Sequence, residues 1–222
     1  MCNNSQMITR LPLFPLGTVV FPGMPLPLHI FESRYKKMIA ACLEKESPFG
    51  VLLIREGTAV SDPNVTTHSI GCSVEIVNSQ DLENGRLFIM SVGQQRFQLL
   101  SLKRDVQPYF VGDVEFLTYT QEDDSALATM TKQLHPLILE YLELLAKVGR
   151  IQFDPHRIPQ EPQDLACLAA SLLNIPADKK QTLLTISKVS HLFRYLIPAY
   201  IRELKILRMM PPNDETSSFS LN

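Results

Sequence analysis

Apolar and polar positions follow two different periods along this chain. In the first half, Cys72, Val74 and Ile76 alternate with Ser73 and Glu75, a pattern typical of a half-buried strand. From Asp124 onward, apolar residues recur at steps of three and four, as on one face of a helix. Strands followed by helices predict an α+β protein.

The first half predicts a small barrel, since about six short strands in about 110 residues are enough to close one. Five prolines between Pro12 and Pro27 exclude one continuous central strand there, and Asn84-Gly85 predicts a hairpin turn. The proline-rich stretch is expected to form three short strand pieces joined by sharp turns: Arg10–Leu16, Thr18–Phe21 and Pro27–Ile30. The other expected strands are Phe49–Arg55, Ile70–Val77, Arg86–Val92, Arg96–Leu102 and Tyr109–Leu117. Residues 56–69 are expected to form a polar loop.

One helix, Glu32–Glu46, is expected to interrupt the strands. Its apolar face consists of Tyr35, Met38, Ile39, Cys42 and Leu43. The second half predicts helices over 124–149, with a kink at Pro136, over Pro162–Leu173, and from Asp178 onward, where Pro198 should kink or split the helix. We therefore predict a barrel subdomain at 1–118, a helical bundle at 119–210 and a disordered tail at 211–222.

Composition indicates an ordinary globular protein. The 222 residues are 45% hydrophobic and 20% charged, with a net charge of −2 that provides no overall attraction for nucleic acid or a membrane. No apolar run approaches the roughly 18 residues of a membrane span, and the N-terminus lacks a secretory signal pattern. The four cysteines have no metal or redox spacing, which favours reduced thiols in the cytoplasm.

The motifs of catalysis are missing from the sequence. No glycine is followed by lysine, so a phosphate-binding P-loop is excluded, and no Gly-x-Ser-x-Gly is present. Ser187-Lys188, expected inside the last helix, would point apart by about 100°. The five histidines lack zinc spacing. We predict a protein that is not an enzyme and that needs no cofactor or metal.

Two groups of side chains are candidates for binding. An aromatic group could line a peptide groove or pack in the barrel core: Phe14, Phe21, Phe31 and Tyr35. A basic group could dock an acidic partner or nucleic acid, or form the solvated face of a helix: Lys179, Lys180, Lys188, Arg194, Arg202 and Lys205, with Arg208 nearby. Glu122-Asp123-Asp124 is better explained by helix capping than by a metal site.

Several of these segments resemble the N-terminal, substrate-binding domain of Lon protease. The resemblance spans roughly residues 8–208. It is carried by Leu-Pro-Leu-Phe-Pro-Leu at 11–16, by segments 19–28 and 30–35, by Ile70-Gly71-Cys72, by the Gly-x-x-Arg-Phe motif that starts at Gly93, and by segment 178–184.

The resemblance implies a PUA-like pseudo-barrel followed by a helical bundle, without the ATPase and protease domains of a complete Lon. It further implies a non-catalytic module that binds unfolded or specific client polypeptides, as an adaptor or holdase, with a separate protease or chaperone as a possible partner. The expected surface is a cleft between barrel and bundle, near residues 14–35 and the loop 56–69. The alternatives are an RNA-binding or small-ligand-binding PUA-like module and, with least support, a hydrolase that uses Ser187.

Overall fold

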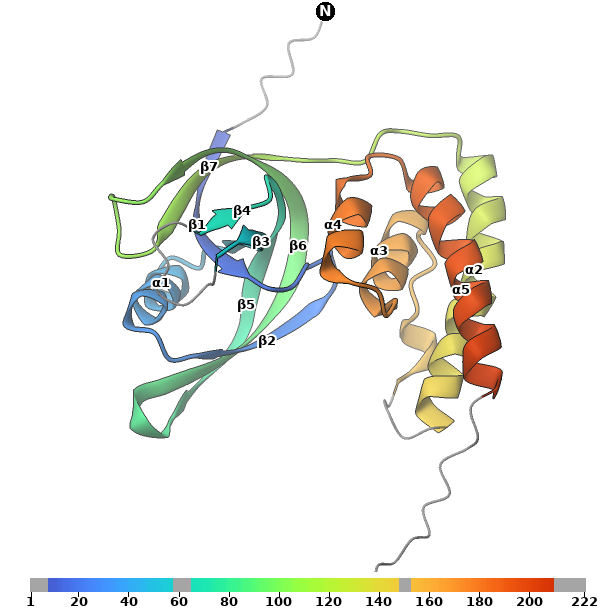
Figure 1. Cartoon of the computed structure of the whole chain (residues 1–222), viewed down its shortest axis with the longest axis horizontal. Helices are drawn as coiled ribbons and strands as arrows, with labels where there is room; N and C mark the ends of the chain where they lie inside the picture. The colour runs from blue at the N-terminus through green and yellow to red at the C-terminus, as the bar shows by residue number, and fades with distance from the viewer. Residues whose placement is uncertain (1–7, 58–64, 148–152, 210–222) are drawn as a thin grey trace, which may run out of the picture. The chain divides into compact units, whose positions relative to one another are not determined.

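A computed structural model describes residues 8–57, 65–147 and 153–209 (Figure 1). The chain divides into two compact units: residues up to Thr120 together with Ala170–Ser187, and Gln121–Ala169 together with the residues from Lys188 onward. Segment 170–187, which the sequence assigns to the helical half, is thus grouped with the barrel. Gly149, the predicted end of a helix, and the predicted tail 211–222 lie outside the described residues.

The first unit is built on seven strands within the described residues. They are β1 (Ile8–Leu16), β2 (Pro25–Ile30), β3 (Phe49–Glu56), β4 (Thr66–Thr67), β5 (Ile70–Leu82), β6 (Arg86–Lys103) and β7 (Phe110–Phe116). Neighbouring strands follow the order β1-β7-β6-β5-β3, and a parallel pairing of β1 with β3 closes the circuit (Figure 1). The predicted barrel is therefore present, with β2 added along β6 and β4 along β3.

The predicted strand Thr18–Phe21 is wrong. Val19, Val20 and Phe21 are buried, but they lie in a non-strand connection that ends in a turn, where the amide of Met24 donates to the carbonyl of Phe21. The high apolar content of this segment suggested a strand. In the structure the same side chains are buried, but a loop carries them. The next strand, β2, begins at Pro25, two residues earlier than predicted.

The β5–β6 hairpin is longer than its alternating pattern indicates. β5 continues to Leu82, and β6 is one strand where two were expected. A short 3-10 turn, Glu83–Gly85, joins them, with Gly85 at a φ of 63° as the Asn-Gly signal predicts. The outer half of this hairpin carries mostly exposed residues. It therefore lacks the alternation of apolar and polar residues by which its length could have been predicted.

The inserted helix α1 (Ser33–Glu44) packs one face against the barrel core. Tyr35, Met38, Ile39 and Cys42 are buried there as predicted. Leu43, which was expected on the same face, is 41% exposed. The helix therefore leaves an apolar side chain on the surface near its C-terminal end.

The second unit contains most of the remaining helices. The last two helices in the chain are separate: the predicted single helix is split between Thr185 and Val189, not at Pro198, which lies inside the final helix. The helices that follow the strands along the chain are α2 (Asp124–Lys147), which continues through Pro136, α3 (Pro162–Leu172), α4 (Ala177–Thr185), which belongs to the first unit, and α5 (Val189–Met209).

Arg96 explains both the position of that split and the grouping of α4 with the barrel. This β6 side chain is 2% exposed, and its guanidinium donates to the carbonyls of Leu184 and Ile186 at 3.0 and 2.6 Å. These are carbonyls that a helix leaves without partners at its C-terminus. The Gly-x-x-Arg-Phe motif thus has a structural role: its arginine ends α4 and holds it against the barrel.

Candidate polypeptide-binding groove

The structure places three of the four candidate aromatic side chains in the core. Phe14, Phe21 and Tyr35 are 7%, 1% and 1% exposed, and the rings of Phe14 and Tyr35 stack with their centroids 4.0 Å apart. This burial corrects the binding interpretation for these three residues in favour of core packing. Phe31, by contrast, is 59% exposed.

Phe31 lies between the end of β2 and the start of α1. The flanking residues are fixed, since the Arg34 guanidinium donates to the Glu32 carboxylate at 2.9 Å and lies 4.6 Å from the centre of the Tyr35 ring. An aromatic side chain is therefore held on the surface by a well-anchored corner of the backbone.

The basic candidates do not lie on one helix. Lys179 and Lys180 belong to α4, Lys188 lies in the connection that follows, and the others are exposed on α5: Arg194, Arg202 and Lys205. Lys180 is half-buried, donates to the carbonyl of Ser171 at 2.6 Å and has its pKa lowered by burial. Arg208 is paired with Glu140 at 2.6 Å. Lys180 and Arg208 thus have structural partners within the protein.

Ser187 and Lys188 lie between α4 and α5, not inside the last helix as expected. The carbonyl of Ser187 accepts the amide of Thr120 at 2.8 Å, so this connection is tied to the chain that leaves the barrel. Within the described ranges, no cluster of three or more metal-ligating side chains occurs. In the same ranges, no helix is both long enough and apolar enough to cross a bilayer.

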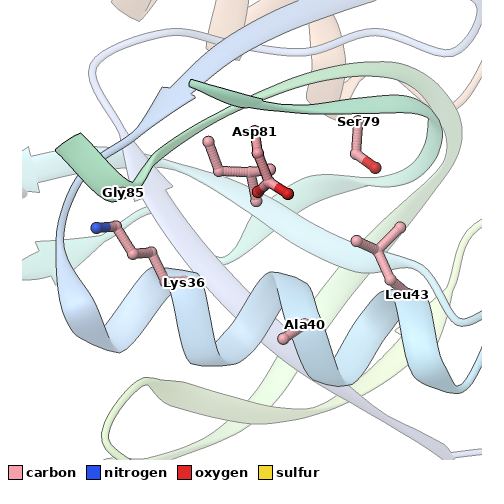
Figure 2. A pocket seen from close by; sticks show the side chains of 7 residues that line it. Lys36, Ala40, Leu43, Ser79, Asp81 and Gly85 are labelled. Carbon is pink, nitrogen blue, oxygen red and sulfur yellow. The ribbon is translucent and has the colours of Figure 1, made fainter. Parts of the chain in front are cut away.

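A cavity of about 310 Å³ lies between α1 and the β5–β6 hairpin (Figure 2). Lys36, Ala40 and Leu43 line it from the helix, and Ser79 and Asp81 line it from β5. Gly85 and Leu87 complete the lining at the tip of the hairpin. Figure 2 shows the Lys36 side chain extending along the helix towards Gly85.

A second cavity of about 380 Å³ adjoins the first, and Leu43 lines both. Its other lining residues come from the end of α1 and the start of the outer hairpin: Cys42, Glu46, Ser47, Glu75 and Ile76. We call the two cavities together the α1–β5 groove. It offers the exposed Leu43 at its centre and polar groups at both ends.

The groove arises because the inner face of the hairpin becomes polar towards its tip. A register shift between Ile76 and Asn78 lets Ile76, Ser79 and Asp81 pair with β6 residues that face the core, among them Ile89 and Leu87. Ser79 and Asp81 thus take positions where large apolar side chains would fill the space over α1. The sequence analysis did not identify these residues. They could have been found by extending the alternation of inward and outward strand positions beyond Val77.

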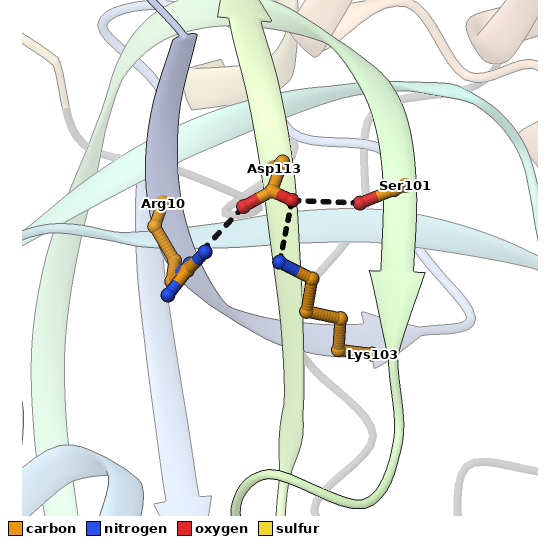
Figure 3. Close-up of polar contacts among 4 residues, drawn as sticks. All are labelled: Arg10, Ser101, Lys103 and Asp113. Carbon is orange, nitrogen blue, oxygen red and sulfur yellow. Dashed lines mark hydrogen bonds and ion pairs between the residues drawn. The ribbon is translucent and has the colours of Figure 1, made fainter.

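The groove is acidic. Glu46, Glu75 and Asp81 line it against a single cation, Lys36, and none of the four makes an ion pair within the described residues. By contrast, the Asp113 carboxylate on β7 is neutralised by partners on the neighbouring strands (Figure 3). There Lys103 at 2.7 Å, Ser101 at 2.9 Å and Arg10 at 3.1 Å hold the pKa of the carboxyl well below its usual range.

A third cavity of about 320 Å³ lies on the other side of α1. Arg10, Pro12, Tyr109 and Val111 line it from the barrel, and Cys42 is among its helical residues. Burial raises the pKa of the Cys42 thiol to about 11. This thiol is therefore protonated at neutral pH and is a poor nucleophile.

Comparisons with known proteins agree on one family. The family model of the ATP-dependent protease La (LON) substrate-binding domain matches residues 10–197. A Lon protease of Paraburkholderia phytofirmans is 27% identical over 195 residues, which are 87% of this chain and 24% of that protein. Lon protease 1 of Hydrogenovibrio crunogenus is 21% identical over 189 residues, which are 85% of this chain and 23% of that protein. This chain therefore spans about a quarter of the length of these relatives.

Two solved structures share the fold. A Lon N-terminal domain protein from Xanthomonas campestris aligns with a TM-score of 0.59 and 25% identity, over 92% of this chain and 100% of that one. The N-terminal domain of a Mycobacterium avium complex Lon protease aligns with a TM-score of 0.64 and 19% identity, over 87% of this chain and 98% of that one.

Proposed function

Because this chain belongs to the Lon substrate-binding domain family, as its sequence motifs predict, we propose that it binds exposed segments of client polypeptides. In this proposal it acts as a non-catalytic adaptor or holdase, and bond cleavage is left to a separate protease. The family match over 188 residues, from 10 to 197, is the observation that carries the proposal.

The geometry of the barrel unit supports binding rather than chemistry. Its surface offers an exposed aromatic ring at Phe31 and an acidic groove with an exposed leucine at its centre. Flexible polypeptides lose conformational entropy when they bind, so the affinity at each such site should be weak and depend on shape and apolar contact.

A cytoplasmic location is part of the proposal. Cys42, Cys72 and Cys167 are buried and form no disulfide among the described residues, as is usual for proteins kept in reducing conditions. Partners in the same compartment would be unfolded proteins and the protease or chaperone that receives them.

The test is titration of the whole chain with a reduced, carboxymethylated test protein labelled with fluorescein, followed by anisotropy. We expect saturable binding, and we expect Phe31→Ser to weaken it about fivefold, the effect of losing one apolar contact in an interface. The thermal midpoint should not change, since Phe31 is exposed.

Val106→Ser is the matched control, because Val106 is 58% exposed and lines none of the three cavities described above. Absence of binding by the unaltered chain at high micromolar concentration would contradict the proposed function.

A further inference from the structure

We propose that the α1–β5 groove takes an extended polypeptide segment that carries basic side chains and adds to β5 as a further strand. The inference rests on the proposed function and specifies which segments of a client are bound, and where. Three features carry it: an open strand edge, two adjoining cavities lined by the same strand, and acidic groups that make no ion pair with any described residue.

The open edge is that of the outer half of β5. From Cys72 to Val74, β5 pairs with β6 on one side and β3 on the other. From Glu75 to Leu82, β6 is the only described strand that pairs with β5, so the opposite edge of this stretch is open. Backbone donors and acceptors on the other edge can therefore hydrogen-bond to an added strand, a recurring way in which proteins bind extended peptides.

The open stretch of β5 lines both cavities, so a strand added along it can place side chains in them. Alternate residues of a strand point to the same side, about 6.6 Å apart, so a bound segment can fill successive cavities with every second residue. The two cavities of the groove adjoin at Leu43, an exposed side chain that can contact apolar groups in both. Volumes of about 310 and 380 Å³ are within the range of ligand pockets.

The charges select the occupant. Glu46, Glu75 and Asp81 against Lys36 give the groove a local charge of 1 − 3 = −2. An extended segment with lysine or arginine beside apolar residues complements this charge, whereas an acidic segment is repelled.

The same charges argue against a second copy of this chain as the occupant. Two β5 edges brought together would place Glu75 and Asp81 of each copy near those of the other. Edge charges and bulges are features with which natural sheets avoid pairing with themselves, and β5 has both. An acidic edge thus remains available for a basic strand while resisting self-association.

Glu46 has an unusual backbone conformation at this end of the groove. It follows α1 with a φ of 47°, in the left-handed region, and its amide and that of Ser47 close the helix on the carbonyls of Leu43 and Cys42. Glycine is the usual residue in this helix-ending motif, because a side chain there is strained. Glu46→Gly should therefore raise the thermal midpoint by about 2–4 °C while it weakens binding of a basic segment.

The experiment uses three short fluorescein-labelled peptides and the whole chain. In the first peptide lysine alternates with valine, in the second glutamate replaces lysine, and the third is the first with alternate backbone amides N-methylated. We expect the first to bind, and the other two to bind at least about tenfold more weakly, through charge repulsion and loss of strand hydrogen bonds respectively.

The test variant combines Glu46→Gln, Glu75→Gln and Asp81→Asn, which removes the charges but keeps the size of the side chains. The control combines Asp105→Asn, Glu143→Gln and Glu161→Gln, three exposed acids that line neither cavity of the groove. We expect about a tenfold loss of affinity for the basic peptide in the test variant and little change in the control.

The outcomes separate this inference from the proposed function. Equal binding of the basic peptide by the two triple variants, or undiminished binding of the N-methylated peptide, overturns the inference even if the unfolded protein still binds. If neither the unfolded protein nor the peptides bind the unaltered chain, the proposed function fails and the inference fails with it.

Discussion

Two buried tyrosines in this protein differ in whether their hydroxyls have partners. The Tyr200 hydroxyl donates to the carbonyl of Ala169 at 2.8 Å. The Tyr35 hydroxyl is buried and has no partner within the described residues, and burial raises its pKa to about 12. A buried hydroxyl without a partner costs about 1–3 kcal/mol of stability. Removing the hydroxyl should therefore stabilise the protein at Tyr35 and destabilise it at Tyr200.

We predict that Tyr35→Phe raises the free energy of unfolding by about 1 kcal/mol, because it removes an unsatisfied group and keeps the ring stacked on Phe14. Tyr200→Phe is the matched control and should lower it by about 1 kcal/mol through loss of a hydrogen bond. Urea denaturation measures both. A loss of stability in Tyr35→Phe would show that its hydroxyl has a partner after all.

Helix boundaries in this protein are decided by side chains distant in sequence. Arg96 satisfies the last carbonyls of α4, and the Glu122 carboxylate accepts the amide of Ser190 at 3.1 Å and the hydroxyl of the same residue, at the start of α5. Glu122 therefore caps α5, whereas the sequence associates it with α2. The neighbouring Asp123 does cap α2, through the amide of Ser125 at 3.1 Å.

The pH dependence of stability should reveal the Glu122 cap. Burial favours a raised pKa, but hydrogen bonds from Ser190 and Val189 and the charge of Lys188 outweigh it and lower the pKa of Glu122. A lowered pKa stabilises the fold above the ordinary carboxyl pKa of about 4.5, and that contribution is lost as the pH falls through the folded value.

We therefore predict that Glu122→Gln costs about 1 kcal/mol at pH 7, as loss of a helix cap does, and that the difference narrows at acidic pH. Glu143→Gln on the exposed side of α2 should change little at either pH. Urea unfolding of both variants at neutral and acidic pH provides the measurement, and a cost for Glu122→Gln that is independent of pH would exclude a capping role for its charge.

Element types were easier to predict than element ends. The 3.6-residue period correctly predicted helices in the second half, because burial of one face imposes that period on the sequence. It could not show the break between α4 and α5, since Arg96 and Glu122 lie far from it in the chain. The split suggested at Pro198 is wrong, because one missing backbone hydrogen bond did not end a helix with so many buried residues, whereas a kink there stays a prediction.

At the scale of the whole barrel, closure depends on close contact between backbones. Leu13 of β1 pairs with Gly50 of β3, and a Cβ at Gly71 would lie 2.3 Å from the carbonyl oxygen of Val51. The space beside these glycines is filled by Phe97, which is fully buried. Small residues at strand crossings thus let a large ring fill the barrel interior.

Gly71→Ala should therefore destabilise the protein by about 1–3 kcal/mol, the usual cost of overpacking a core. Gly17→Ala is the control, because a Cβ there would meet nothing within 4 Å. Thermal unfolding distinguishes the two, and an unchanged midpoint in Gly71→Ala would mean that β3 and β5 move apart freely.

Taken alone, the sequence determined what burial and local backbone chemistry dictate: strands before helices, an inserted helix, a hairpin turn at Asn84-Gly85, and the motifs of the Lon substrate-binding domain. Tertiary structure decided what depends on residues distant in the chain, including which aromatic rings are buried, where α4 ends, and the groove between α1 and the hairpin. The physical reason is that the spacing of apolar residues shows which face of an element is buried. The partners of each side chain on that face depend on which other elements fold against it.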